Sequence, residues 1–259
     1  MKISNRFRRL KHDAIRSLYA SNSIFLRKYI EFWTPKSNSI EEFLWETAEE
    51  IPDFFVVQIG ANDGYVNDPL VKLIRKGKWK GVLLEPQKLV FDQYLTPLYG
   101  HYKDIHLVNA AVGTKSEKRD LFTISFSAER WATGLASFVK ESLETQISVG
   151  YVDKCIKKYE ATAPINKADY ISTQQVKCIT FQDVIEQYQI KKIDLLQIDT
   201  EGFDFEVIKM FPFDKMKPKI ISFESERLSS TDFNACKIFL IQLGYNVSDI
   251  GRDAVAVRL

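Results

Sequence analysis

The sequence predicts an α/β protein in which helices cover both faces of a mostly parallel sheet. From residue 53 onward, short runs of β-branched and aromatic residues alternate with segments of helical periodicity, which is the rhythm of parallel strands joined by helices. Glycine or acidic residues directly follow several of these runs, as expected at the ligand-binding edge of such a sheet. With 259 residues, 45% of them hydrophobic, the chain can bury one sizeable core.

The expected elements, taken in chain order, each rest on a local pattern. Runs rich in Val, Ile and aromatic residues predict strands at 53–59, 80–84, 105–112, 120–125, 175–179, 193–198, 219–223, 245–247 and 254–257. Apolar residues three and four apart predict helices at 66–76, 87–98, 181–188, 203–210 and 230–243. Thr180 and Asp183 have the spacing of a capping arrangement at the start of the helix at 181–188. We expect about seven of the strands to form the sheet, with the last two as an antiparallel pair.

Residues 1–45 are expected to form a basic, amphipathic helical arm ahead of the α/β domain at 46–259. Residues 1–40 carry a net charge of +7, so the remainder of this +2 chain carries −5. One helical face is apolar and consists of Ile3, Phe7, Leu10, Ala14 and Leu18. Three partners for this face stay open: the body of the protein, a second copy in a homodimer, and an anionic membrane surface. The body is too acidic to favour nucleic acid as a partner.

The predicted location is cytoplasmic, either free or peripheral to the inner face of the membrane through the arm. The longest apolar runs are far shorter than the roughly 18 residues of a membrane span, and the N-terminus lacks the apolar region of a secretory signal. Cys155, Cys178 and Cys236 are odd in number and widely spaced, which predicts reduced thiols rather than disulfides or a zinc site.

Residues 126–173 interrupt the regular alternation with a segment rich in Ser, Thr, Gly and charged residues. Trp131, Tyr151 and Tyr159 give this insertion more aromatic surface than a solvated linker carries. We expect it to form a substrate-binding site and its lid, with Arg130, Trp131 and Ser137 as the candidate binding residues. The alternative is a helical cap that covers a sheet edge.

The first motif with chemical meaning is the loop Gly60–Ala61–Asn62–Asp63–Gly64, directly after the first strand. The dinucleotide fingerprint GxGxxG needs glycine or alanine at its third position, where this chain has Tyr65, so that match fails. The GxGxG loop of methyltransferases aligns with Gly60, Asn62 and Gly64, which is two matches of three. The loop therefore favours adenosylmethionine over NAD. The alternative is a turn that uses Asn and Gly for conformational reasons alone.

Carboxylates follow three of the predicted strands. Glu85 ends the second strand and can accept hydrogen bonds from both hydroxyls of a ribose. Asp199, Glu201 and Asp204 come after a strongly buried strand, and Glu224 comes after the next one. Capping of the following helices is the alternative role for these side chains. A divalent metal is possible on this acidic rim, but no adjacent Asp-Asp or Asp-Glu pair marks one, so the sequence assigns no metal ligands.

Five ordered segments resemble the successive motifs of FkbM-type methyltransferases, over roughly residues 50 to 258. They are FVVQIGANDG at 55–64, LLEP at 83–86, VNAAVG at 108–113, LLQIDTEGF at 195–203 and ISFE at 221–224. The resemblance implies a class I methyltransferase fold, with a Rossmann-like seven-stranded sheet of order 3-2-1-4-5-7-6. It also implies S-adenosylmethionine as cofactor and O-methylation of a hydroxyl on a sugar, glycan or related natural product.

The resemblance further implies roles for single residues. Carried over by position, the cofactor-binding residues are Gly60, Asn62 and Gly64 beneath the methionine and ribose, Glu85 at the ribose hydroxyls, Asn109, Ala110 and Ala111 around the adenine, and Asp199 beside the amino acid moiety. Glu201 is the expected base for the hydroxyl proton, with Glu224 as second candidate. Two alternatives stay open: an NAD-binding oxidoreductase and a non-catalytic partner-binding domain. The second is supported by Gln58, which stands where the family has Asp.

Overall fold

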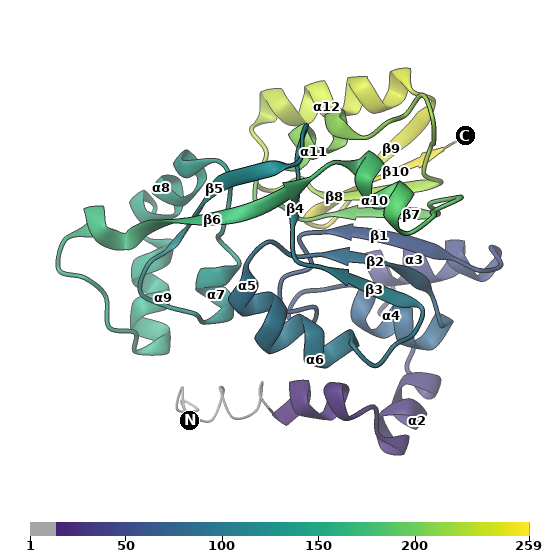
Figure 1. Ribbon diagram of the computed structural model, residues 1–259, viewed down its shortest axis with the longest axis horizontal. Coiled ribbons are helices and arrows are strands. Elements are labelled where there is room, and N and C mark those ends of the chain that lie inside the picture. The colour runs from purple at the N-terminus through teal and green to yellow at the C-terminus, as the bar shows by residue number, and fades with distance from the viewer. Residues whose placement is uncertain (1–13, 259) are drawn as a thin grey trace.

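The computed structural model describes residues 14–258, and its centre is a seven-stranded sheet with the order β3-β2-β1-β7-β8-β10-β9 (Figure 1). The strands are β1 (Phe55–Ile59), β2 (Lys80–Leu84), β3 (Ile105–Val108), β7 (Leu195–Ile198), β8 (Ile220–Glu224), β9 (Tyr245–Ile250) and β10 (Asp253–Arg258). Strand β10 runs antiparallel to β8 and β9, whereas the other neighbouring strands are parallel. Counted in chain order within this sheet, the strands follow 3-2-1-4-5-7-6. The predicted α/β fold class is confirmed.

Helices cover both faces of this sheet (Figure 1). One face carries α10 (Phe181–Gln187), α11 (Asp204–Met210) and α12 (Ser230–Gln242). The other carries α3 (Ile40–Glu49), α4 (Leu70–Gly77) and a continuous helix made of α5 (Lys88–Val90), a π-helical stretch (Phe91–Leu95) and α6 (Thr96–Tyr99). Val57 and Val56 are adjacent on β1 and point to opposite faces of the sheet. Val57 belongs to the core on the first face, and Val56 belongs to the core on the second. The central strands are therefore buried on both sides, as a parallel sheet requires.

Helix α4 begins later than the sequence pattern indicates. The apolar spacing predicts a helix at 66–76, but the first helical residue is Leu70. Asn67 adopts a left-handed backbone conformation with φ 60°, and Pro69 directly precedes the helix. Because an α-helix needs right-handed dihedral angles throughout, the turn at Asn67 excludes the first residues of the predicted segment.

A second, three-stranded sheet with the order β4-β6-β5 lies beside the main one (Figure 1). It consists of β4 (Ala111–Val112), β5 (Glu117–Ile124) and β6 (Ile171–Ile179). The strands predicted at 120–125 and 175–179 therefore pair with each other and stay outside the main sheet. Between them the insertion forms α7 (Arg130–Thr133), α8 (Lys140–Ser148), α9 (Tyr151–Tyr159) and a short 3₁₀ helix (Lys167–Tyr170). These helices bury a core of their own, which includes Trp131, Leu143 and Val152.

The N-terminal segment packs on the face of the sheet that carries α4 and α6 (Figure 1). Residues 14–21 are helical, and helix α2 (Ile24–Phe32) follows. Tyr19, Leu26 and Ile30 are buried in the same core as α4. The ring of Tyr19 also lies 4.9 Å from the guanidinium carbon of Arg75. Ile3, Phe7 and Leu10 of the predicted apolar face lie outside the described residues. Within residues 14–258, no helix combines the length and apolar character needed to cross a membrane.

The carboxyl ends of four parallel strands meet at one edge of the main sheet. Ile59 pairs with Leu84 on one side and with Ile198 on the other, and Ile198 pairs with Phe223. The residues that come next in the four strands are Gly60, Glu85, Asp199 and Glu224. The register of the sheet thus brings together residues that are up to 164 positions apart in the sequence, which places a candidate site at this edge.

Candidate active site

The turn after β1 depends on the close approach of two strand ends. Gly60 has φ 80°, a conformation that favours glycine. A Cβ atom at this position would overlap the carbonyl oxygen of Asp199, at the end of β7. Glycine is therefore required at position 60 for both backbone conformation and space, and the loop that follows passes directly over the end of β7.

The loop after β1 is fastened to the end of β2 by Glu85. The backbone N–H of Asn62 donates to Glu85 Oε2 at 2.8 Å, and the backbone N–H of Gln87 donates to Oε1 at 2.8 Å. Because a carboxylate oxygen has two lone pairs, each oxygen can accept one further hydrogen bond. Glu85 is buried, and this burial raises its pKa to about 7.

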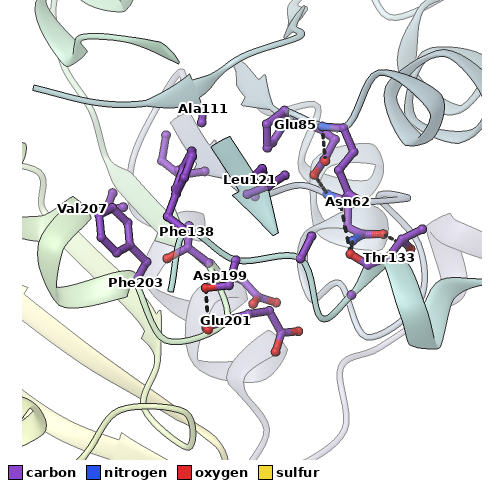
Figure 2. Close-up of a pocket in the computed structure, with 18 of the residues that line it drawn as sticks. Asn62, Glu85, Ala111, Leu121, Thr133, Phe138, Asp199, Glu201, Phe203 and Val207 are labelled. Carbon is purple, nitrogen blue, oxygen red and sulfur yellow. Dashed lines mark hydrogen bonds between the residues drawn. The ribbon is translucent and has the colours of Figure 1, made fainter. Parts of the chain in front are cut away.

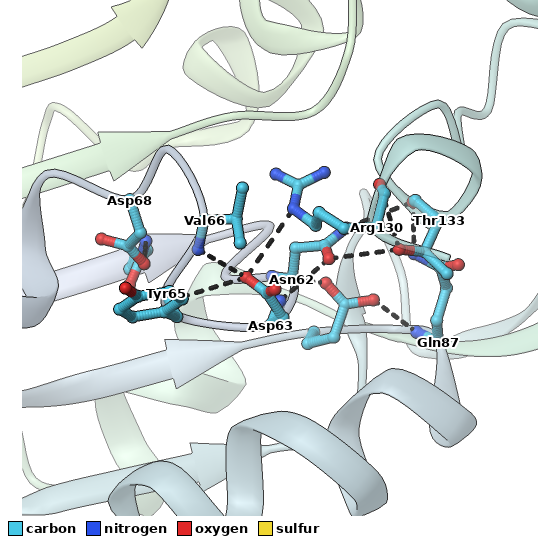
Figure 3. Close-up of polar contacts among 10 residues, drawn as sticks. Asn62, Asp63, Tyr65, Val66, Asp68, Gln87, Arg130 and Thr133 are labelled. Atoms are coloured by element: carbon cyan, nitrogen blue, oxygen red, sulfur yellow. Dashed lines mark hydrogen bonds and ion pairs between the residues drawn. The ribbon is translucent and has the colours of Figure 1, made fainter. Parts of the chain in front are cut away.

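The insertion closes over this loop through Thr133 (Figure 3). Its carbonyl oxygen accepts hydrogen bonds from Asn62 Nδ2 at 3.2 Å and from Gln87 Nε2 at 3.0 Å. Arg130, one turn earlier in α7, places its Nε 3.7 Å from Asp63 Oδ1. Asp63 in turn accepts hydrogen bonds from two backbone N–H groups of the same loop. Helix α7 is thus positioned by polar contacts to residues after β1 and β2.

A narrow pocket lies between these loops and the insertion, and we call it the first pocket (Figure 2). Its cavity volume is about 50 Å³, within a wider space of about 600 Å³ that includes open solvent. Its polar wall includes Asn62, Glu85 and Asp199, and its apolar wall includes Ala111, Leu121 and Phe138. Figure 2 shows Glu85 and Asn62 on one side and Phe203 and Val207 on the other. A ligand here would meet a buried carboxylate and an apolar surface at once.

Three carboxylates gather where β7 and β8 end. Oxygen atoms of Asp199, Glu201 and Glu224 all lie within 4.8 Å of one another. Burial and the neighbouring Asp199 raise the pKa of Glu201 to about 7. Burial, together with the negative charge of the other carboxylates, raises the pKa of Glu224 to about 9. Arg227 Nε lies 3.2 Å from Glu201 Oε2, and Arg252 Nη2 lies 3.6 Å from Glu224 Oε1.

The second pocket adjoins the first on the side of these carboxylates. Asp199, Glu201, Arg130 and Thr133 line both pockets, while Glu224 lines the second. The cavity volume of the second pocket is about 610 Å³. The insertion supplies one wall with Trp131, Tyr151, Lys158 and Tyr159. The rings of Trp131 and Tyr159 stack with centroids 6.3 Å apart. Aromatic faces and cations thus surround a cavity that opens next to the carboxylates.

The structure brings most of the predicted cofactor-binding residues to the first pocket. Gly60, Asn62, Glu85, Ala111 and Asp199 line it. The other three have different surroundings. Gly64 faces Leu95, Leu98 and Tyr99 of the helix below. Ala110 is buried in the main core. Asn109 donates through Nδ2 to the carbonyl oxygens of Glu85 and Pro86 at 2.8 and 3.2 Å. These three residues support the loops around the pocket and do not line the pocket themselves.

The loop after β7 is held by a carboxylate that does not line either pocket. Asp204 is completely buried and accepts hydrogen bonds from the hydroxyl of Thr200 at 3.1 Å and the N–H of Gly202 at 3.2 Å. Between them Glu201 has φ 52°, an uncommon conformation for a residue with a side chain. Asp204 therefore has the structural role that the sequence left open, and it fixes the backbone from which Glu201 projects.

The predicted substrate-binding residues divide between the pockets. Arg130 lines both, and Trp131 lines the second. Ser137 is buried beside the first pocket, with its hydroxyl 3.3 Å from the carbonyl oxygen of Glu201. Sequence reasoning missed Gln87, Thr133 and Arg227. Gln87 and Arg227 each lie two or three residues past a strand end that had been singled out, which is the only signal that the sequence offered for them.

Gln58 lies beneath the first loop, in the interior of the sheet edge. Its Nε2 donates to Asp68 Oδ2 at 3.0 Å. Burial raises the pKa of Asp68 to about 6. Position 58 therefore lacks the carboxylate of the family pattern and has the amide of Gln58 instead. Asp68 places a carboxylate in direct contact with this amide.

Several solved methyltransferase structures are similar to this chain, whereas no curated protein matches its sequence. An O-methyltransferase from Bacillus cereus in complex with SAH is similar at 9% identity and a TM-score of 0.45, covering 100% of this chain and 92% of that one. A putative caffeoyl-CoA O-methyltransferase from Staphylococcus aureus shows 10% identity and a TM-score of 0.44, and the match covers 96% of this chain and 100% of that one. Methyltransferase FkbM from Methylobacillus flagellatus KT shows 12% identity and a TM-score of 0.45, and the match covers 95% of this chain and 60% of that one.

The match to a protein family covers most of the sequence motifs. The family model described as Methyltransferase FkbM domain matches residues 58–247. This range contains Asn62, Glu85, Asp199 and Glu224, so it includes the loops that form both pockets. It also decides between the two enzyme classes considered from the sequence, in favour of the methyltransferase over the NAD-binding oxidoreductase. Because the match covers well over half of the sequence, the chain belongs to the FkbM methyltransferase family.

Proposed function

We propose that this protein transfers a methyl group from S-adenosylmethionine to a hydroxyl of a sugar, glycan or related natural product. The observation that carries the proposal is the position of Glu85. Its buried carboxylate ends β2, accepts one backbone N–H on each oxygen, and opens into a pocket with an apolar wall. Each of the two oxygens can accept one further hydrogen bond, which matches the two neighbouring hydroxyl donors of a ribose.

The remaining residues of the first pocket fit the other parts of the cofactor. Leu121 and Phe138 offer an apolar surface for the adenine ring. Gly60 lines the pocket and lets the loop after β1 approach the end of β7, and Asp199 offers a negative charge for the methionine amino group. When bound, S-adenosylmethionine supplies an electrophilic methyl group on a sulfonium. In an in-line displacement much of the rate comes from positioning, which these fixed loops provide.

Glu201 is the proposed base for the acceptor hydroxyl. It lines both pockets, so its carboxylate lies where a cofactor in the first pocket and an acceptor in the second would meet. A raised pKa of about 7 makes it an effective proton acceptor near neutral pH. Arg227 Nε lies 3.2 Å from Oε2 and helps to keep the carboxylate in place beside both pockets. Glu224 is the second candidate, and its higher pKa of about 9 makes it the weaker choice at neutral pH.

The acceptor site is proposed to be the second pocket, with the insertion as its lid. The stacked rings of Trp131 and Tyr159 suit the C–H faces of a saccharide. Arg130 and Lys158 could donate hydrogen bonds to hydroxyls or to an attached phosphate. The pocket is larger than a single sugar ring requires, which favours an acceptor with more than one unit.

Two measurements test this function. Calorimetric titration with S-adenosylhomocysteine should show one site, and NADH should not compete for it. Mass spectrometry of glycans from a strain that lacks the gene should show the loss of one methyl group from a saccharide. Binding of S-adenosylhomocysteine without turnover across a broad acceptor panel would instead favour a non-catalytic partner-binding domain. Absence of S-adenosylhomocysteine binding would contradict the proposal.

A further inference from the structure

Three carboxylates converge at the boundary between the two pockets. Asp199 and Glu201 come from the loop after β7, and Glu224 is the last residue of β8. One oxygen from each lies within 4.8 Å of the others. Two oxygens that bind the same Ca²⁺ at about 2.4 Å can be at most about 4.8 Å apart, so each pair among the three carboxylates meets this limit.

Glu224 gives an independent indication that a ligand belongs there. Only 3% of its surface is exposed, and Oε2 has no hydrogen-bond partner within residues 14–258. A buried polar oxygen without a partner is costly, because it has lost its water and gained nothing in return. The same side chain lines the second pocket, so the unpartnered carboxylate belongs to the wall of that cavity.

The neighbouring arginines leave one oxygen of Glu224 available. Arg227 contacts Oε2 of Glu201, and Arg252 contacts Oε1 of Glu224. The opposite oxygen of Glu224, Oε2, has no hydrogen-bond partner among the described residues. Arg252 is also half-exposed and stands 3.6 Å away, which limits how far it can compensate a buried charge. The arginines therefore orient the two carboxylates without completing their coordination.

We propose that Asp199, Glu201 and Glu224 bind a divalent cation that prefers oxygen ligands, such as Ca²⁺ or Mn²⁺. The sequence left a divalent metal possible on this rim but marked no ligands for it. The marker sought was an adjacent acidic pair, whereas the three proposed ligands follow two strands that meet only in the folded sheet. Carboxylate oxygens are the ligands that such hard cations select.

The proposed cation deepens the proposed function, and its role rests on that function. An ion with three protein ligands keeps further coordination positions, which here would face the second pocket. A hydroxyl oxygen of the acceptor could occupy one of them. The cation would then orient the acceptor beside the first pocket and lower the pKa of its hydroxyl. With the cation bound, Glu201 would serve as its ligand, so the role of base proposed for Glu201 belongs to the protein without the ion.

The test is a titration of the full-length protein with Mn²⁺, in which electron paramagnetic resonance reports the free ion. We expect one tight site per chain, and competition by Ca²⁺. Glu224→Gln keeps the shape of the side chain and should weaken Mn²⁺ binding at least tenfold. The matched control is Glu226→Gln, two residues further on, which is exposed and is absent from the carboxylate cluster. It should bind Mn²⁺ like the wild type.

Two results would overturn the proposal: no Mn²⁺ binding by the wild type at millimolar concentration, or equal affinity in Glu224→Gln and wild type. Thermal melting of each variant shows whether it is folded, and Asp199→Asn provides a second variant if Glu224→Gln unfolds. S-adenosylhomocysteine affinity, measured without metal, separates the two proposals. S-adenosylhomocysteine binding without Mn²⁺ binding would refute the proposed cation site alone. Mn²⁺ binding without S-adenosylhomocysteine binding would refute the proposed function alone.

Discussion

The backbone N–H of Asn62 lies 2.8 Å from Glu85 Oε2, and this hydrogen bond joins the loop after β1 to the end of β2. It forms although Asn62 itself is in the left-handed region, with φ 44°. The buried carboxylate is thereby held in one orientation before any ligand binds. A preorganised acceptor loses less conformational freedom on binding, which is why Glu85 is the centre of the first predictions.

Replacing Glu85 should weaken S-adenosylhomocysteine binding. Glu85→Ala removes the acceptor for the ribose hydroxyls, and hydrogen bonds to a charged group are worth about 1.5–3 kcal/mol, or roughly 10- to 150-fold in affinity. Calorimetry measures the change. Asp92→Asn, an exposed carboxylate in the helix that follows, serves as control. Because the alanine also leaves two backbone N–H groups unpaired, Glu85→Gln should be measured beside it. Unchanged affinity in both variants would refute the assignment.

Binding of S-adenosylhomocysteine should depend on pH through Glu85. Its pKa is raised by burial to about 7, so the carboxyl group is partly protonated at neutral pH. The ribose hydroxyls donate hydrogen bonds, and the ionised form accepts them best. Affinity should therefore rise as the pH increases through 7, and fall by up to about tenfold per unit below it. Glu85→Gln should flatten this dependence. A profile that is the same in both proteins would assign the titration to another group.

Gly60→Ala should destabilise the protein more than an equivalent change elsewhere. Gly150 is the matched control, because it also has a positive φ of 75°, but nothing among residues 14–258 lies within 4 Å of the position that its Cβ would take. Gly150→Ala should cost about 1–2 kcal/mol for the left-handed conformation alone. Gly60→Ala adds overlap with the Asp199 carbonyl, worth about 1–3 kcal/mol more. Denaturant unfolding compares the two. Equal losses would mean that the strands can separate at no cost.

The insertion should control turnover of the acceptor. Arg130→Ala and Trp131→Ala are expected to lower acceptor turnover at least tenfold, about 1.4 kcal/mol. Trp131→Ala should leave S-adenosylhomocysteine affinity near wild type, whereas Arg130 also lines the first pocket, so its variant should weaken that affinity as well. Trp131 is also part of the core of the insertion, so Trp131→Phe is needed to separate packing from binding. Lys157→Ala is the control, since Lys157 is exposed and lines neither pocket. Equal losses of cofactor binding and turnover in Trp131→Ala would show that the insertion acts on the first pocket instead.

The N-terminal arm should bind an anionic membrane surface. Phe25 and Phe32 are 81% and 80% exposed on α2, on the side away from the buried Leu26 and Ile30. The net charge of +7 in residues 1–40 would add electrostatic attraction. Phe25→Ser combined with Phe32→Ser should preserve the fold and reduce binding to vesicles that contain anionic lipid. High salt should weaken the wild type in the same assay.

Light scattering on the wild type and on the same double variant measures the oligomeric state and tests the alternative partner, a second copy of the chain. A wild-type dimer that becomes a monomer in the double variant would identify a second copy as the partner. A wild type that is monomeric and indifferent to vesicles would contradict both partners that the sequence left open for the exposed face.

Local sequence patterns located the strands of the main sheet and most of its helices, because these depend on residues that are close together in the chain. They did not predict α3, and they placed the start of α4 too early. The resemblance added the order of the strands, which no local pattern contains. The second sheet could not be predicted in this way. Strand β5 pairs with β6 in the register Leu121 to Gln174, across an insertion of more than forty residues, and such non-local pairing leaves no periodic signal.

The candidate site shows the same division. Its position at the strand ends, with Gly60 and Glu85 as its markers, followed from the sequence alone because glycine and acidic residues stood directly after predicted strands. Which carboxylates face the pockets did not follow. Asp204 turns inward to hold its own loop, whereas Glu201 and Glu224 meet at the edge of the second pocket. The direction of each side chain depends on loop conformation and on the register of distant strands, so only the tertiary structure decided which residues act together.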